Sequence, residues 1–330
     1  MTYRGHVNEK KRQAAVVFNP TKVDVAALRA TVTRVAEEAG WAPSLWFETS
    51  IEDPGSGCAT EAVAAGAELV LAAGGDGTVR AVAEVLRSTG IPLGLLPSGT
   101  GNLLARNLEL TLDHLEHSVE TAFLGRDRPI DVGVVEAESE DGSIARNIFL
   151  VMAGVGLDAQ MVANTNPELK KRVGWLAYVD AIIRSLRGNT RVRMRYSIDG
   201  AAKQAMTAHT VLVGNCGSLP GNILLLPDAA VDDGIFDVVA LRPKGLVGWV
   251  QIWVKIVWEN GVLRRSAAGR KLMSYTREVR TLRYMNGSSF VARLSSPEDY
   301  ELDGDHFGTA VALRATVDHL ALIVRVPSDS

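Results

Sequence analysis

Residues 69–102 read LVLAAGGDGTVRAVAEVLRSTGIPLGLLPSGTGN, and this stretch decides the fold. Its two apolar runs, Leu69–Ala73 and Ile91–Leu96, have the length and composition of buried strands. Each run ends in a glycine-rich turn, and each turn is followed by a segment with helical spacing, over Val79–Arg87 and Leu103–Leu108. Wholly apolar strands that alternate with helices are typical of a parallel sheet covered on both faces.

The same alternation extends toward the start of the chain. The run Ala14–Phe18 predicts another strand, and a helical pattern follows over Val25–Ala39. Ser44–Thr49 and Thr60–Ala65 predict a further strand and a short helix. Residues 1–128 are therefore expected to form an α/β domain with a parallel sheet.

The pattern changes after about Arg128. Segments of alternating polar and apolar residues follow, separated by pairs such as Asp141–Gly142 and Asp199–Gly200, which are typical of hairpin turns. Residues 129–316 are therefore expected to form a mainly antiparallel β-sandwich domain. The last segment, residues 317–330, is a candidate to return to the first domain as a strand.

The composition excludes several classes of protein. The chain has 330 residues, of which 47% are hydrophobic and 22% charged, which is typical of a globular protein rather than a disordered one. Its net charge of −3 provides no overall basic field, so nucleic acid is not expected as a partner. The two cysteines, Cys58 and Cys216, lie far apart without metal-ligand spacing and predict reduced, buried thiols. The polar start and the turn-formers within 204–227 predict no signal peptide, no membrane span and a cytoplasmic location.

The turn Gly74-Gly75-Asp76-Gly77-Thr78 lies between a predicted strand and a predicted helix. Glycines let the main chain approach a ligand closely, and a helix start presents unpaired N–H groups to an anion. A second turn, Pro97–Asn102, follows the next strand, and Asn19-Pro20-Thr21 follows the first one. Because the carboxyl ends of parallel strands meet at one edge of a sheet, the three turns together predict a phosphate site. A tight turn with Asp76 as a helix cap is the structural alternative.

These motifs resemble the diacylglycerol kinase catalytic-domain family, which includes bacterial lipid kinases and sphingosine kinases. The GGDGT core alone is shared with NAD kinases and phosphofructokinases, but GGDGTVRAVAEVL together with LLPSGTGNLLARNL is much more specific. Further matches follow in the same order, within residues 131–133, 147–158, 213–237 and 301–308. The resemblance covers roughly residues 14–315. It implies an ATP-binding α/β domain followed by a β-sandwich that binds the lipid substrate, as in the NAD kinase and diacylglycerol kinase folds.

The resemblance also implies an ATP site. Asp76 would organise the phosphates through Mg²⁺, which binds hard oxygen ligands. The residues that the family pattern places at ATP are Asn19, Thr49, Gly74, Gly75, Asp76, Gly77, Thr78, Gly99 and Thr100. The turns themselves add three further cofactor-binding candidates, Pro20, Thr21 and Asn102.

The turn Leu302-Asp303-Gly304-Asp305 supplies the candidates for the catalytic base. Phosphoryl transfer needs positioning, charge neutralisation and a group that takes the proton of the acceptor hydroxyl. The family usually carries Asp-Gly-Glu here, so Asp305 stands where a glutamate is usual, and both Asp303 and Asp305 remain open as the base. A hairpin turn without chemistry is the alternative.

A second acidic turn is Asp232-Asp233-Gly234. The resemblance to bacterial kinases implies a structural Mg²⁺ held by Asp233 and by the backbone carbonyls of Ala230 and Ile235. An ordinary Asp–Gly turn is the alternative. The chain also departs from many bacterial members at Leu103, where they carry an aspartate after the asparagine.

Two further helical patterns, Pro167–Leu186 and Lys244–Trp258, interrupt the β-rich half. The second contains three tryptophans and is followed by four basic residues within 264–271. Such a basic run indicates docking to an anionic membrane surface. His319 has no motif around it and carries no functional signal.

These observations predict an ATP- and Mg²⁺-dependent kinase, a transferase that phosphorylates a hydroxyl of diacylglycerol or a related membrane lipid and so serves phospholipid biosynthesis. An NAD kinase is the alternative, and a catalytically inactive nucleotide- or lipid-binding protein is a second one. The expected location is the cytoplasm, with peripheral binding at the inner membrane surface as an open alternative. A monomer and a homodimer both remain open.

Overall fold

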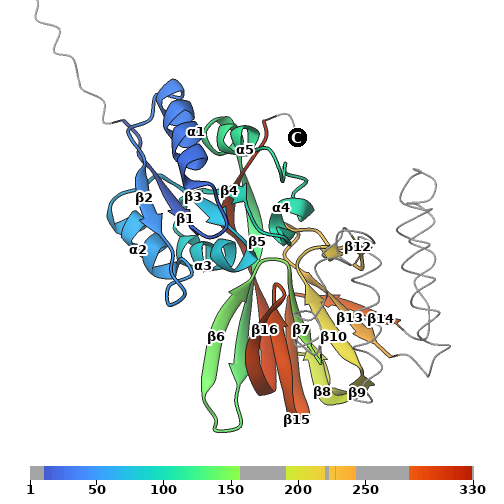
Figure 1. The fold of residues 1–330 in the computed structure, drawn as a ribbon. Helices are drawn as coiled ribbons and strands as arrows, with labels where there is room; N and C mark the ends of the chain where they lie inside the picture. The colour runs from blue at the N-terminus through green and yellow to red at the C-terminus, as the bar shows by residue number, and fades with distance from the viewer. Residues whose placement is uncertain (1–10, 157–190, 220–222, 227, 243–281, 329–330) are drawn as a thin grey trace, which may run out of the picture. The chain divides into compact units, whose positions relative to one another are not determined.

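The structure is a computed structural model, and it describes residues 11–156, 191–219, 223–226, 228–242 and 282–328. The chain divides into two compact units (Figure 1). The first unit comprises Met1–Thr100, Leu110–Arg128 and Leu322–Ser330, and the second comprises Gly101–Glu109 and Pro129–Ala321. The predicted helices Pro167–Leu186 and Lys244–Trp258 and the basic run within 264–271 lie outside the described residues.

The first unit is built around a parallel sheet in the order β2–β1–β3–β4. The end of β16 joins this sheet beside β4, where Val324 pairs with Leu93 in parallel. All residues of β1 and β3 are buried, as their apolar sequences predicted. The four strands are β1 (Ala14–Phe18), β2 (Leu45–Glu48), β3 (Leu69–Gly74) and β4 (Leu93–Pro97).

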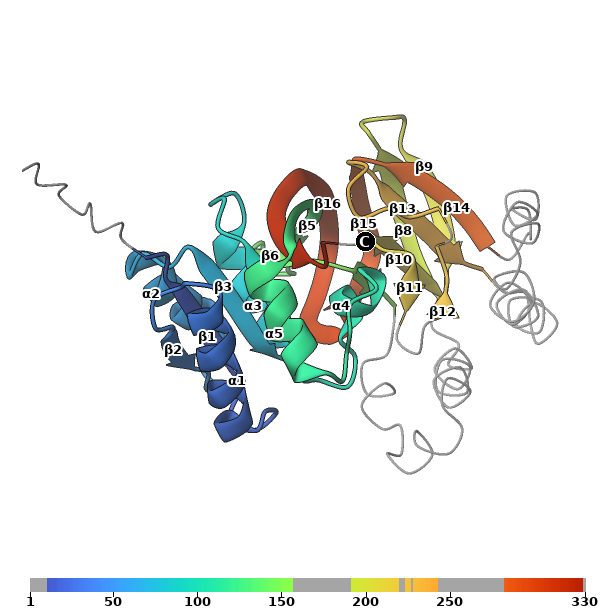
Figure 2. The ribbon, with the colours of Figure 1, turned by 90° about the horizontal axis from the view of Figure 1, so that it is seen from above.

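Helices cover both faces of this sheet. Helices α1 and α5 lie side by side on one face, whereas α2 packs against α3 (Figure 2). The alternate residues Ala14, Val16 and Phe18 of β1 share a core with α1 and α5. Helix α5 approaches β4 so closely that a Cβ atom at Gly94 would lie 2.7 Å from the Cβ of Ala122. The helices are α1 (Val25–Glu38), α2 (Ser56–Ala64), α3 (Asp76–Leu86) and α5 (Leu115–Leu124).

Two of these helices begin earlier than the sequence pattern predicted. Helix α3 begins at Asp76 rather than Val79, because Gly75 is its extended N-cap and an acidic side chain in the first turn is favourable at the positive end of the helix dipole. Helix α2 begins at Ser56 rather than Thr60, because the Asp53 carboxylate accepts backbone N–H bonds at its start. Part of the glycine-rich turn is therefore helical.

The second unit is mainly antiparallel, as predicted. Its strands run in the order β14–β13–β10–β7–β15–β16, with β8 paired to both β15 and β9, and with β5 paired to both β16 and β6. The strands are β5 (Arg126–Glu138), β6 (Ile144–Phe149), β7 (Met152–Val155), β8 (Val192–Ile198), β9 (Gln204–Ala208), β10 (Thr210–Gly214), β13 (Phe236–Leu241), β14 (Leu282–Gly287), β15 (Ser289–Leu302) and β16 (Asp305–Val326). The short strands β11 (Ser218–Leu219) and β12 (Ile223–Leu224) form a separate pair, and α4 (Leu103–Asn107) precedes them in this unit.

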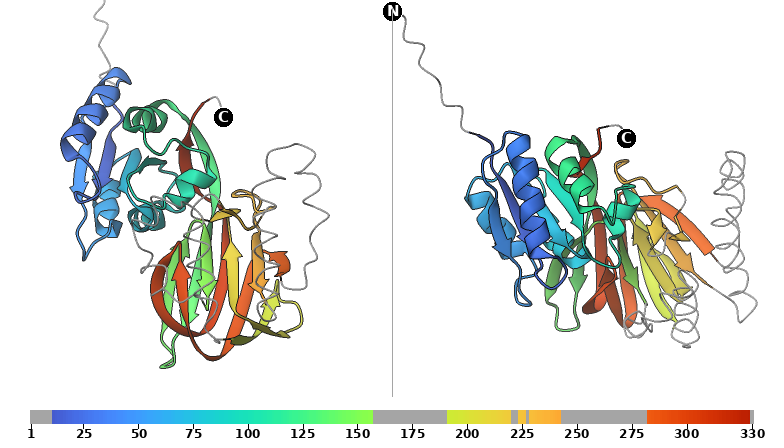
Figure 3. Two further views of the ribbon diagram at one scale, coloured as in Figure 1. Left: turned by 45° about the vertical axis from the view of Figure 1, so that its right-hand side comes forward. Right: turned by 45° about the horizontal axis from the view of Figure 1, so that its top comes forward.

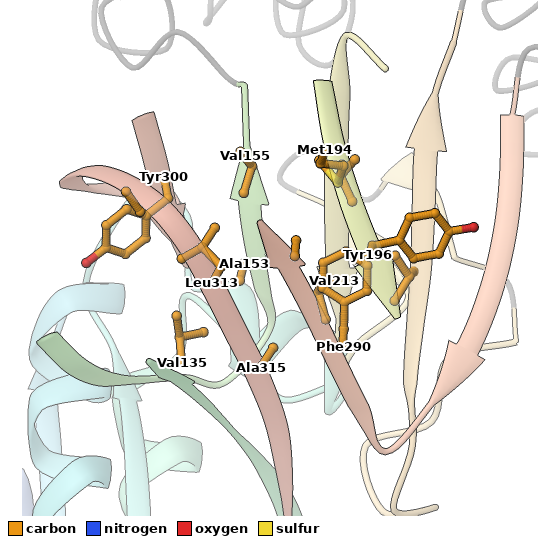
Figure 4. Packing of buried hydrophobic residues seen from close by; sticks show 14 of the residues in the cluster. Val135, Ala153, Val155, Met194, Tyr196, Val213, Phe290, Tyr300, Leu313 and Ala315 are labelled. Carbon is orange, nitrogen blue, oxygen red and sulfur yellow. The ribbon is translucent and has the colours of Figure 1, made fainter. Parts of the chain in front are cut away.

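The long strand β15 organises the layers of this unit. Its first half, over Phe290–Leu294, pairs with β8, and its last residues, over Tyr300–Leu302, pair with β7. Two register shifts against β16 follow the first half, one between Arg293 and Glu298 and one between Asp299 and Glu301, and such bulges bend a strand (Figure 3). Side chains from β5, β7, β8, β10, β15 and β16 then share one apolar core (Figure 4). The Asp–Gly pairs at 199–200 and 303–304 adopt positive φ angles, as their hairpin turns require.

Two further expectations concern the cysteines and the membrane. Cys58 and Cys216 are both buried free thiols, as predicted. Among the described residues, no helix combines the length and the apolar character that crossing a bilayer requires.

Candidate active site

The turns at the carboxyl edge of the parallel sheet are hydrogen-bonded to one another. The backbone N–H of Asn19 donates to the carbonyl of Ala73 at 2.9 Å, and that of Ser98 donates to the carbonyl of Gly74 at 3.1 Å. The turn after β1 and the turn after β4 are therefore both fixed to the end of β3, which carries the glycine-rich turn. The structure thus brings together Asn19, the glycine-rich turn and the first part of the turn after β4, up to Thr100, within the first unit.

Two neighbouring glycines in the turn have different surroundings. A Cβ atom at Gly74 would lie 2.7 Å from the Cβ and 2.8 Å from the Oγ1 of Thr78, so only glycine fits there. At Gly75 the nearest atom to such a Cβ is the Cα of Gly99, at 3.8 Å, which is an ordinary contact. The φ angle of Gly75 is −91°, which any residue can adopt. The fold therefore requires glycine at 74 but not at 75.

Asp76 begins helix α3 and is half-buried. The first N–H groups of a helix have no hydrogen-bond acceptor within the helix. In α3 these groups lie at the same edge of the sheet and are available to an anion. Thr78 is buried and packs against Gly74. The predicted residues of GGDGT thus form a helix start that can face an anion.

The turn after β1 is shaped by Asn19. Its Oδ1 accepts from the backbone N–H of Thr21 at 3.0 Å and from the Thr21 hydroxyl at 2.8 Å, with Pro20 between them. Thr49 is buried at the end of β2, and its N–H donates to the carbonyl of Phe18 at 2.9 Å. These predicted residues therefore hold the backbone of the edge in place.

Asp53 is a residue at this edge that the sequence motifs did not indicate. Its carboxylate accepts from the N–H groups of Gly55, Gly57 and Cys58 at 2.9–3.0 Å. Burial raises the pKa of Asp53, but the hydrogen bonds to these three backbone groups outweigh it and hold the pKa below its ordinary value. The signal was present in the sequence as an Asp-Pro-Gly-Ser stretch before a helix.

A cavity of about 260 Å³ also opens near this edge. Lys22, Ser98 and His114 are among its lining residues, together with others from α1 and the start of α5. Helices α1 and α5 lie on one face of the sheet, whereas α3, which follows the glycine-rich turn, packs with α2. The cavity is therefore on the face opposite to α3. We therefore do not count it as the phosphate site.

The turn after β4 is divided between the two units. Gly99 and Thr100 belong to the first unit, whereas Asn102 belongs to the second. Asn102 is buried, adopts a left-handed conformation with φ 48°, and is the N-cap residue of α4. Of the predicted cofactor-binding residues, it is the one that is not in the first unit.

Asp303 is a buried carboxylate in the β15–β16 turn. It accepts from three consecutive backbone N–H groups, those of Leu150 at 3.0 Å, Val151 at 2.8 Å and Met152 at 3.1 Å. Its own N–H donates to the carbonyl of Met152. The residue is 5% exposed, so these backbone N–H groups take the place of water as hydrogen-bond donors to the carboxylate. Asp303 therefore fixes the turn between β6 and β7.

Asp305 differs from Asp303 although it lies two residues away. It is the first residue of β16, pairs with Leu302, and is exposed. Its neighbour His306 lies 3.9 Å from Asp299, a contact that is ionic only when the histidine is protonated. Of the two acids in the turn, Asp305 is the one that a molecule in solution can reach.

The second unit also contains a buried carboxylate that the sequence reading gave no role. Asp131 is fully buried on β5, and it accepts from the Nδ1 of His319, the N–H of Leu320 and the N–H of Gly234, each at 2.7 Å. An aspartate within the apolar run of β5 requires hydrogen-bond partners when it is buried, and its position in that run was the sequence signal for such a site. His319 could not be found from the sequence, because its partner lies 188 residues away.

Asn215 connects these two carboxylates within the second unit. Its Nδ2 donates to the carbonyls of Asp131 at 2.9 Å and Leu150 at 3.1 Å, while the N–H of Leu150 donates to Asp303. All of these groups are buried. A hydrogen-bonded network therefore runs from Asp131 to the acidic turn.

Asp233, the predicted metal ligand, is exposed, and its Oδ1 accepts from the N–H of Ile235 at 3.1 Å. Ala230 precedes it in the same turn. Within the described residues, no three or more His, Cys, Asp or Glu side chains gather in a way that could hold a metal ion. One carboxylate with backbone carbonyls is a set of hard oxygen donors, which fits an Mg²⁺ ion that keeps most of its waters.

Solved structures share this fold. A putative diacylglycerol kinase from Bacillus anthracis str. Sterne matches over 99% of both chains, with a TM-score of 0.70 and 19% identity. Yeast NADH kinase matches over 96% of this chain and 79% of that chain, with a TM-score of 0.51 and 11% identity. These matches confirm the predicted architecture of an α/β domain and a β-sandwich, as in diacylglycerol kinases and NAD kinases.

Sequence comparisons define the family. The model of the diacylglycerol kinase catalytic domain matches residues 13–135, and that of the YegS C-terminal NAD kinase beta sandwich-like domain matches residues 150–257. The diacylglycerol kinase of Bacillus subtilis (strain 168) is 30% identical over 251 residues, which cover 73% of this chain and 77% of that protein. The chain belongs to the diacylglycerol kinase catalytic-domain family.

Other relatives match over a smaller share of their length. A probable YegS-like lipid kinase of Pseudomonas aeruginosa (strain UCBPP-PA14) is 37% identical over 197 residues, which cover 57% of this chain and 59% of that protein. An uncharacterized Synechocystis protein is 26% identical over 74% of this chain and 52% of its own length. The chain thus spans between about half and three quarters of these relatives.

Proposed function

We propose that the protein is an ATP-dependent lipid kinase that transfers the γ-phosphoryl group of ATP to a hydroxyl of diacylglycerol or a related membrane lipid. The observation that carries this proposal is Gly75. It stands at the start of a helix in a family of lipid kinases, and the fold itself has no need of a glycine there. A residue without a side chain at that point leaves room for a phosphate against the backbone.

The nucleotide site follows from the edge of the parallel sheet. The N–H groups at the start of α3 would bind the phosphates, with Gly75 permitting their close approach. The turns at Asn19 and Gly99, together with Thr49, would surround the rest of the nucleotide. These assignments rest on the common edge and on the hydrogen bonds that join the turns.

The catalytic base would be Asp305. In the transfer, the lipid hydroxyl oxygen forms a bond to the γ-phosphorus, the bond to the bridging oxygen of ADP breaks, and the hydroxyl proton passes to a carboxylate. An exposed carboxylate can accept that proton, whereas Asp303 already accepts three backbone hydrogen bonds. Asp303 would therefore position the turn that carries Asp305.

Two groups of residues fit Mg²⁺. Asp76 would hold the ion that accompanies the ATP phosphates, and Asp233 with the carbonyls of Ala230 and Ile235 would hold a structural ion. When bound, Mg²⁺ neutralises the charge that develops on the phosphoryl oxygens. Chelation with EDTA should therefore abolish the transfer, and added Mg²⁺ should restore it.

The acyl chains would bind inside the β-sandwich. A small cavity of about 20 Å³ there is lined entirely by apolar or aromatic side chains, among them Val135, Val155, Val213 and Leu313 (Figure 4). The cavity is smaller than an acyl chain, so the sheets would have to separate or the side chains move on binding.

The competing activity is that of an NAD kinase, because yeast NADH kinase shares the fold. The experiment that separates the two is incubation of the protein with labelled ATP and Mg²⁺ plus either total lipid extract or NAD, followed by mass spectrometry of the products. A phosphorylated lipid with unchanged NAD supports the proposal, and NADP alone would replace it with the alternative. Binding of ATP with no product in either arm would indicate a catalytically inactive protein.

A further inference from the structure

A hollow of about 370 Å³ lies on the outer face of the second unit, and none of the proposed catalytic, nucleotide-binding or metal-binding residues lines it. Strands β5, β6, β8, β15 and β16 contribute its lining. On β8 and β15 the residues that alternate with the buried core positions are exposed there, because successive side chains on a strand point to opposite faces. The charged side chains at the hollow are Arg195, Arg293, Arg314, Lys203, Glu136 and Glu138.

Two arginines in this hollow stand directly opposite each other. Arg195 on β8 pairs in register with Arg293 on β15. Side chains at such positions are close neighbours, and like charges there are destabilising. On the other side of Arg293, the register partner on β16 is Ala312, whose small side chain leaves the space open.

The carboxylates at the hollow do not balance its cations. Arg293 lies 3.5 Å from Glu138, but the side chains are 69% and 37% exposed respectively, so this pair is weak. Within the described part of the chain, Arg195 and Arg314 form no ion pair. Four cationic side chains against two carboxylates leave an excess of two positive charges at one place, in a chain whose net charge is −3.

Exposed apolar side chains accompany this charge. Ile144 is 68% exposed at the start of β6, and Val291, which pairs in register with Arg314, is 38% exposed on β15. Large apolar residues with this exposure are few in the described chain. A ligand with a charged group and an adjoining apolar part would use both features, whereas a free inorganic anion would use only the arginines.

We propose that this hollow binds the phosphate group of an anionic phospholipid and so holds the protein at a membrane surface. Guanidinium groups match phosphate oxygens in a bidentate manner, and a phosphate between Arg195 and Arg293 would remove the repulsion between them. Ile144 and Val291 would contact the lipid surface beside the headgroup. This proposal concerns binding without catalysis, so it stands or fails independently of the kinase activity.

The test is flotation of the full-length protein with vesicles, in the absence of ATP. The vesicles are phosphatidylcholine alone or phosphatidylcholine with phosphatidate. The wild type should float with the second kind only, and Arg195→Gln/Arg293→Gln should reduce its partitioning by about thirtyfold. The matched control is Lys11→Gln/Arg242→Gln, which removes the same charge from two exposed positions outside the hollow and should leave the partitioning unchanged.

Several results would overturn the proposal. These are equal flotation of the wild type with both vesicles, wild-type partitioning of the Arg195→Gln/Arg293→Gln variant, or an equal loss in the control, which would show a general charge effect. A titration with inorganic phosphate distinguishes the source of the phosphate group. If inorganic phosphate raises the melting temperature as much as phosphatidate vesicles do, the ligand is a free anion and not a lipid.

A second measurement separates a binding role from a structural one. If Arg195 and Arg293 repel each other across the two strands, the single variant Arg195→Gln should melt at a higher temperature than the wild type in the absence of lipid. The same variant should bind phosphatidate vesicles less tightly. A lower melting temperature would show that the arginines stabilise the fold, and would contradict the proposal.

Discussion

The glycine-rich turn of the first unit and the acidic turn of the second can be compared residue by residue, because each contains two similar residues in different surroundings. In the first, Gly74 is required because Thr78 occupies the space of a side chain, while Gly75 beside it has room for one. In the second, Asp303 is buried under three backbone N–H groups, while Asp305 two residues on is exposed. Each turn therefore holds one residue that is fixed by close packing or burial and one that is not. Gly75 and Asp305 are the better candidates for function, because the fold has room for a side chain at Gly75 and a ligand can reach the exposed Asp305.

The largest effect is expected at Asp305. Replacing it with alanine should lower the rate of lipid phosphorylation by about 10²- to 10⁴-fold, because the acceptor hydroxyl loses its base. The free energy of unfolding, measured with urea, should stay within about 0.5 kcal/mol of wild type because the side chain is exposed. Asp305→Glu, which restores the side chain usual in the family, serves as the control and should retain activity. A full rate in Asp305→Ala would remove this residue from the mechanism.

The opposite behaviour is expected at Asp303. Asp303→Ala leaves the N–H groups of Leu150, Val151 and Met152 buried without an acceptor, so the free energy of unfolding should fall by about 3 kcal/mol or more. Urea denaturation followed by circular dichroism measures this loss. If Asp303→Ala is as stable as wild type but inactive, the roles of the two aspartates are reversed.

The two glycines provide a smaller and cleaner contrast. Gly74→Ala forces a methyl group against Thr78 and should cost about 1–3 kcal/mol in stability. Gly75→Ala should leave the stability nearly unchanged and weaken ATP binding, which isothermal titration calorimetry measures. Equal ATP affinity in Gly75→Ala and wild type would show that no phosphate lies against this residue.

The smallest effect concerns the pH dependence of stability at Cys58, in the same unit as the glycine-rich turn. Burial and the nearby Asp53 carboxylate raise the pKa of Cys58 from 9.0 to about 11. Below about pH 9 the thiol is protonated in both states, and its contribution to stability is complete. Between pH 9 and 11 the unfolded chain ionises first, so stability should fall, by on the order of 1 kcal/mol. Urea denaturation at several pH values measures this, and Cys58→Ser should lose the part of the slope that Cys58 causes.

The sequence was sufficient where a local pattern determines the structure. Strands β1 and β3 are apolar throughout and lie where that pattern places them, and the Asp–Gly pairs at 199–200 and 303–304 are hairpin turns. Helix α5 was not predicted from the sequence, because histidines and acids interrupt its apolar positions. That one face of α5 is buried becomes evident only from its close contact with β4 at Gly94.

Contacts between distant parts of the chain were not predictable. The carboxylate of Asp131 meets His319 and Gly234, and Asp303 meets the backbone of Leu150, through folds of the chain that no local spacing encodes. For the same reason, the sequence named both Asp303 and Asp305 as candidates but could not distinguish them. That distinction depends on burial, which the sandwich as a whole determines.

The most direct measurement is a single-turnover transfer from γ-labelled ATP, with Mg²⁺ and vesicles that contain diacylglycerol, by the wild type, Gly75→Ala and Asp305→Ala. We expect that label passes to the lipid in the wild type, and that the two variants remain folded but transfer it far more slowly. Label that appears only on NAD when NAD is added, or equal transfer by all three proteins, would contradict it.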